Sequence, residues 1–65
     1  MPVTKVSKAV EYHENELEAL RCIRNAVDSM DACSPLAARA HLCLAVDFVD
    51  KMVDCKQEFD MIGED

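Results

Sequence analysis

The sequence predicts an all-α protein, an antiparallel two-helix hairpin that dimerises into a four-helix bundle. Apolar residues recur at steps of three and four in two long stretches, and a Ser-Pro pair separates them. One glycine and two prolines in 65 residues leave few turns. We expect a single domain over residues 1–65, with a helix over about 5–31, a turn over 31–35 and a helix over about 35–60.

The second helix has the wider apolar surface. At roughly 100° per residue, its apolar positions span roughly 200° of the helix circumference. Docking on a single neighbour needs a stripe of roughly 100°. A hairpin supplies one neighbour, so we expect the remaining apolar surface to bind a second copy or another protein. The apolar positions are Leu42, Leu44, Ala45, Val46, Phe48, Val49, Met52, Val53, Cys55 and Phe59.

The first helix begins near Thr4 or Ser7, since either hydroxyl can accept a hydrogen bond from a free amide of the first turn. The second begins at Ser34-Pro35, with Ser34 as the expected N-cap and Pro35 at the first helical position. So short a connection makes the helices antiparallel neighbours. Residues whose numbers sum to about 66 should then lie at the same level.

A chain this short usually needs disulfides, a metal or oligomerisation for stability. We expect oligomerisation, because an open apolar patch of this size is uncommon on a monomer. Arg24 and Lys56 lie within the apolar faces, where they either reach outward to water or form ion pairs between subunits that fix the register; pairing is favoured. The expected dimer or partner face consists of Leu17, Leu20, Val27, Phe48, Val49, Met52 and Phe59.

The layout resembles plasmid Rop-type hairpin dimers in length and architecture. No motif is shared, so the resemblance implies nothing about function.

Residues with reactive side chains are few, and we expect no catalytic residue, cofactor or metal. The four cysteines form no C-x-x-C pair, and buried free thiols are the ordinary case. A bridge between Cys22 and Cys43 is geometrically conceivable, because the hairpin brings them level, but the cytosol keeps thiols reduced. His13 and His41 each approach one cysteine, which is too few ligands for a tetrahedral site.

The net charge of −6 argues against direct binding of nucleic acid, which needs clustered basic residues. No apolar run is long enough to cross a membrane, and the N-terminus lacks the features of a signal peptide. We therefore expect a cytoplasmic protein with no membrane contact.

Four acidic residues of the second helix form the expected partner-binding ridge. Asp47, Asp50, Asp54 and Glu58 follow one another at steps of three and four, so they line one side of the helix. Such an acidic ridge could dock on a basic surface, including the nucleic-acid-binding face of a regulator. The simpler interpretation is a solvated surface that keeps the protein soluble.

Two classes of function remain open. The first, which we favour, is a non-enzymatic regulator that sequesters or inhibits another protein, as phage-type anti-activators and antirepressors do. It would use the acidic ridge or the exposed apolar surface. The second is a structural oligomerisation or adaptor module. A Rop-like RNA-binding hairpin is a third and weaker alternative.

Overall fold

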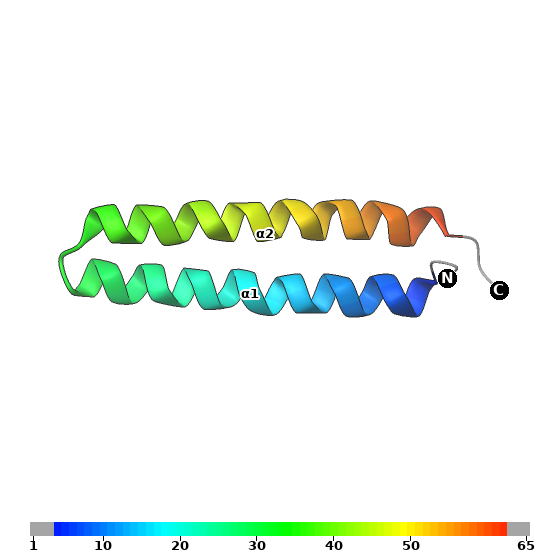
Figure 1. The fold of residues 1–65 in the computed structure, drawn as a ribbon, viewed down its shortest axis with the longest axis horizontal. Helices are drawn as coiled ribbons and strands as arrows, with labels where there is room; N and C mark the ends of the chain where they lie inside the picture. The colour runs from blue at the N-terminus through cyan, green and yellow to red at the C-terminus, as the bar shows by residue number, and fades with distance from the viewer. Residues whose placement is uncertain (1–3, 63–65) are drawn as a thin grey trace.

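The computed structural model describes residues 4–62, which form two long helices and a tight turn (Figure 1). Helix α1 runs over Lys5–Asp31 and helix α2 over Pro35–Met61. The helices lie side by side and antiparallel, with overall dimensions of 51 × 17 × 13 Å. The predicted helical hairpin is thus confirmed, whereas the four-helix bundle stays a prediction.

The two helix starts differ in their caps. Thr4 has extended backbone angles, and its Oγ1 accepts a hydrogen bond of 3.0 Å from the Ser7 amide, as expected of an N-cap. Ser34 also precedes its helix, but its hydroxyl makes no capping hydrogen bond. Ser34 is therefore the N-cap, as expected, but without the side-chain hydrogen bond. The ψ angle of Ser34 is 73°, which is not an extended value. The start of α2 depends instead on Pro35 at the first helical position and on the Ser34 carbonyl, which accepts a hydrogen bond of 3.0 Å from the Ala38 amide.

The turn is a Schellman motif, in which two backbone amides close the end of α1. The Cys33 amide donates to the Met30 carbonyl at 3.0 Å, and the Ser34 amide donates to the Ser29 carbonyl at 2.8 Å. The motif needs a left-handed residue, and Cys33 fills that position with φ of 59°. Glycine is the usual residue at this position, so a cysteine there did not indicate this cap in advance.

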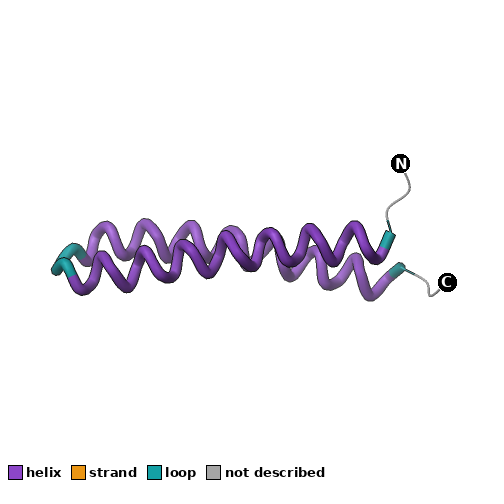
Figure 2. The backbone as a smooth tube through the Cα atoms, turned by 90° about the horizontal axis from the view of Figure 1, so that it is seen from below, coloured by secondary structure: helices purple, strands orange, loops and turns teal. Residues whose placement is uncertain are grey.

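The helices meet along a seam of regularly spaced residues. The spacing alternates between three and four on both helices, the pattern of a left-handed coiled coil. In the edge-on view of Figure 2 the two helices cross rather than run strictly parallel. The seam consists of Lys8, Tyr12, Asn15, Ala19, Cys22, Ala26 and Ser29 on α1, Ala38, His41, Ala45, Phe48, Met52, Cys55 and Phe59 on α2, and Ile62 just after α2, all buried or half-buried.

The fully buried part of this seam is made of small residues. Among residues 4–62, the buried residues are all alanines and cysteines, and Ala26 is 0% exposed. Small side chains let two helices approach closely, but they bury little apolar area. The large aliphatic side chains lie elsewhere.

The broad apolar surface expected on α2 is consequently divided. Phe48, Met52 and Phe59 are half-buried at the seam. Leu42 and Val49 lie beside the seam and are exposed. Leu44, which periodicity grouped with them, is also exposed, about 200° around the helix from Leu42.

Candidate interaction surface

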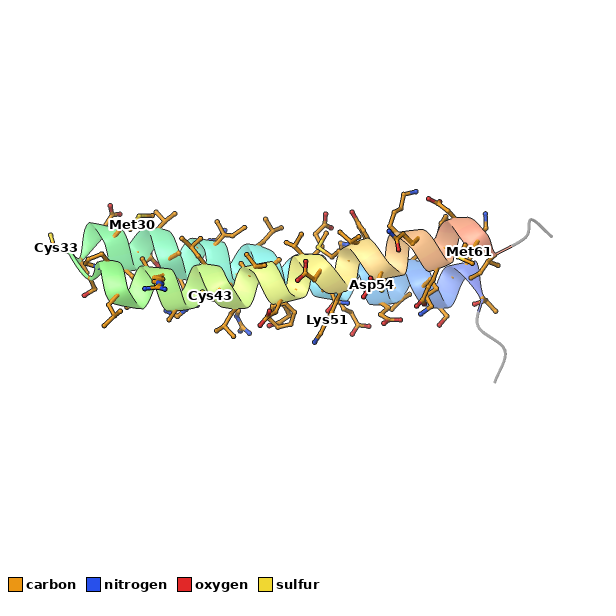
Figure 3. The ribbon with its side chains drawn as sticks, turned by 90° about the horizontal axis from the view of Figure 1, so that it is seen from above. Met30, Cys33, Cys43, Lys51, Asp54 and Met61 are labelled. Atoms are coloured by element: carbon orange, nitrogen blue, oxygen red, sulfur yellow. The ribbon has the colours of Figure 1, made fainter. Side chains whose placement is uncertain are left out.

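An exposed aliphatic surface extends along one side of the hairpin, and we call it the apolar face. Each of its residues is 41–58% exposed. In Figure 3 this face lies along the upper edge of the hairpin, where Met30 is labelled, and Lys51 lies at the lower edge. The apolar face consists of Leu20, Ile23, Val27 and Met30 from α1 and Leu42, Val46, Val49 and Val53 from α2. Val10 and Leu17 continue it around α1, away from the seam.

The accessible area of the chain is large for its mass. A compact monomer of 7.3 kDa should expose about 4,200 Å². The hairpin exposes 5060 Å². The excess of about 900 Å² is close to the area of about 800 Å² that each partner buries in a standard protein–protein interface.

The side of the hairpin with the apolar face is hollowed at the junction of the two helices. Near the turn, Met30, Leu42 and Val46 border a hollow of about 300 Å³. Toward the termini, Val49 and Val53 border another of about 400 Å³. Hollows between two helices are sites where side chains of a further helix can insert.

The structure divides the interface residues expected from the sequence into two groups. Exposed positions are available to a partner, whereas half-buried positions are already engaged between α1 and α2. Leu17, Leu20, Val27 and Val49 belong to the first group, and Phe48, Met52 and Phe59 belong to the second.

The two cations proposed to fix the register have different surroundings. Arg24 is exposed, and no carboxylate of residues 4–62 lies within ion-pair distance of its guanidinium. The Lys56 ammonium contacts Asp60 on the same helix at 3.0 Å and lies 5.6 Å from the Phe59 ring centroid. Of these two cations, Arg24 is therefore the one that remains available to a partner.

Lys8 links the two helices near the termini, a role that the sequence did not reveal. Its ammonium pairs with Glu58 of α2 and with Glu11 of α1, the latter at 3.3 Å. The hydrogen bond with Glu58 is the main reason that the pKa of Lys8 lies above its ordinary value of 10.5. The residue numbers 8 and 58 sum to 66, and residues with that sum were expected to lie at the same level. This expectation could have indicated the pair.

Cys55 lies beside this ion pair and is 3% exposed. Burial raises the pKa of its thiol, and the nearby Glu11 carboxylate raises it further. The thiol therefore stays protonated at neutral pH, the unreactive form of cysteine.

The other cysteines are also free. Cys22 is buried in the seam, but Cys43 is exposed on the outer side of α2, so the two thiols do not meet despite their shared level. Cys33 is exposed at the turn. Burial, the ordinary expectation for a free thiol, therefore applies to Cys22 and Cys55 alone.

The two histidines lie apart. The His13 ring is exposed, with Nδ1 3.2 Å from the Glu16 carboxylate, and His41 is half-buried at the seam. Within residues 4–62, no group of three or more potential ligands is placed to hold a metal ion.

The acidic ridge is exposed along its whole length. Asp54 lies on the side of α2 that faces away from α1 (Figure 3). Glu58 differs from the three aspartates because it is paired with Lys8. Asp47, Asp50 and Asp54 have no basic nitrogen within ion-pair distance among the described residues.

Neither α1 nor α2 is apolar enough over a sufficient length to cross a membrane. Comparisons of the chain with models of protein families, with curated proteins and with solved structures give no match.

Proposed function

We propose that this protein is a non-enzymatic regulator: a small cytoplasmic homodimer that inhibits or sequesters another protein, in the manner of a phage-type anti-activator or antirepressor. The observation that supports the proposal is the apolar face, together with the excess accessible area of the whole chain, about 900 Å². A surface of this kind is typical of a protein that works in an assembly.

Dimerisation is the first part of the proposal. Two hairpins stack through their apolar faces, and the result is a four-helix bundle with a closed core. A twofold arrangement is the commonest closed assembly, and it brings the same surface of both copies together. The small residues of the seam then hold each hairpin together, while the large aliphatic residues form the core between hairpins.

Contact with another protein is the second part. Asp54 faces away from α1, and the acidic ridge lies outside the apolar face, so the bundle leaves the ridge accessible. The three exposed aspartates of the ridge on each subunit attract a basic surface, such as the nucleic-acid-binding face of a regulator. Occupying that face blocks the regulator.

Sedimentation equilibrium on two matched variants tests the dimer. The wild-type chain should give about twice the 7.3 kDa mass at micromolar concentration. Leu20→Glu places a charge on the apolar face and should yield monomers, whereas Leu44→Glu changes an equally exposed leucine outside that face and should stay dimeric. A monomeric wild-type protein, or equal behaviour of the two variants, would show that the apolar face does not join two copies.

Affinity capture of the tagged protein from its source lysate tests the partner. A stoichiometric regulator that is lost at high salt supports the proposal. Replacing Asp47, Asp50 and Asp54 with asparagine should abolish its capture, while replacing Glu14, Glu18 and Asp28 of α1 with their amides removes the same charge and should not. Recovery of the protein alone would favour an oligomerisation module, and nuclease-sensitive recovery would favour an RNA-binding hairpin.

A further inference from the structure

We propose that the two hairpins of the dimer pack head to tail, so that the turn of one copy lies beside the chain termini of the other. The inference rests on the proposed dimer and adds its orientation. Two twofold arrangements place the apolar faces together. In the parallel one both turns lie at the same end, and in the antiparallel one they lie at opposite ends.

The distribution of charge along the hairpin favours the antiparallel arrangement. Lys8 and Glu58 are in contact, so residue n of α1 lies level with residue 66 − n of α2, and residues 19–47 form the half that contains the turn. Three arginines and three aspartates cancel in this half. The described residues of the other half, 4–18 and 48–62, have four lysines and eight acidic residues, so this half has a net charge of −4.

A parallel dimer would place two such acidic halves side by side. The helices of a bundle lie about 8–10 Å apart, which is close to the screening length of about 8 Å at physiological salt. Like charges at that spacing repel and destabilise the assembly. An antiparallel dimer instead places each acidic half beside a neutral half that contains three arginines.

In the antiparallel orientation, the apolar stripe of each helix lies against the same stripe of the partner subunit. Under a twofold axis across the middle of the hairpin, α1 packs on the partner's α1 and α2 on the partner's α2. Leu17 then lies level with the partner's Leu20, and Val46 lies level with the partner's Val49. The aliphatic centres of both stripes therefore coincide at one level.

Arg24 also finds a complementary group in this orientation. It lies within one helical turn of the partner's Glu16, a distance that an arginine side chain can span. In the parallel orientation Arg24 would instead lie within one turn of the partner's Arg39. Arg39 itself comes level with the partner's Lys56, whose charge Asp60 already offsets at 3.0 Å.

A distance measurement between spin labels distinguishes the two orientations. Cys33 is exposed at the turn, and Cys22 and Cys55 are buried, so Cys43→Ser leaves Cys33 as the reactive thiol. In the antiparallel dimer the two Cys33 labels should be about 44 Å apart, at 1.5 Å per residue from the twofold axis. In the parallel dimer they should be less than about 20 Å apart, two helix spacings.

A second labelled variant shows whether the subunits are dimeric at all. Asp47→Cys with Cys33→Ser and Cys43→Ser places a label at the middle level, where both orientations predict a separation below about 30 Å. A long Cys33 distance with a short one at position 47 supports the proposal. Short distances at both positions would overturn the orientation and leave the dimer intact. No coupling at either position, with a monomeric sedimentation mass, would overturn both.

Discussion

The ammonium of Lys8 on α1 pairs with the carboxylate of Glu58 on α2, the one ion pair that joins the two helices among residues 4–62. The Lys8 side chain is only 14% exposed, whereas that of Lys56, which pairs within its own helix, is 62% exposed. Removing the Lys8 charge leaves the Glu58 and Glu11 carboxylates without their shared cation. Lys8→Met should therefore destabilise the hairpin more than Lys56→Met, as measured by urea denaturation.

This pair also predicts how stability changes at alkaline pH. The folded-state pKa of Lys8 lies above 10.5, chiefly because Glu58 accepts its hydrogen bond. The contribution is then fully present below pH 10.5 and is lost as the pH rises through the folded-state pKa. The stability difference between wild type and Lys8→Met should shrink over that range. A constant difference would show that Lys8 acts through packing of its aliphatic stem.

Cys33 holds a left-handed conformation that costs about 1–2 kcal/mol for a residue with a Cβ atom. Cys33→Gly removes that cost, although glycine loses more backbone entropy on folding. We expect a net stabilisation of about 1 kcal/mol in thermal or urea unfolding. Cys33→Ala keeps the Cβ and should not stabilise the protein, so equal stabilities for Gly and Ala would contradict this explanation.

Ala26 is 0% exposed between the helices, so a larger side chain there must displace its neighbours. Ala26→Leu should force α1 and α2 apart and cost about 1–3 kcal/mol, despite its greater hydrophobicity. Ala40→Leu adds the same atoms at an exposed position of α2 and should change stability by less than about 0.5 kcal/mol. Similar urea midpoints for the two variants would show that the seam is loosely packed.

The hairpin and the Thr4 cap were predictable because they depend on short-range patterns. The sequence did not predict which part of the apolar surface of α2 faces α1. Periodicity places residues around one helix without showing where the neighbouring helix lies. Ala38 and Ala45 take the seam because small side chains permit close contact, and Leu42 and Val46 are displaced to the side. The Cys33 turn was also missed, because that position usually contains glycine.

The four cysteines should differ in reactivity according to their burial. Cys33 and Cys43 are exposed, whereas Cys22 is 7% and Cys55 3% exposed. The pKa of the Cys55 thiol is also raised by burial and by Glu11, which lowers its thiolate fraction. A disulfide reagent at neutral pH should therefore modify Cys33 and Cys43 rapidly and the other pair only as the hairpin opens. Mass spectrometry of quenched samples identifies the sites. As a control, all four thiols should react rapidly once urea has unfolded the chain. Equal rates for all four thiols in the absence of urea would mean that the seam opens freely.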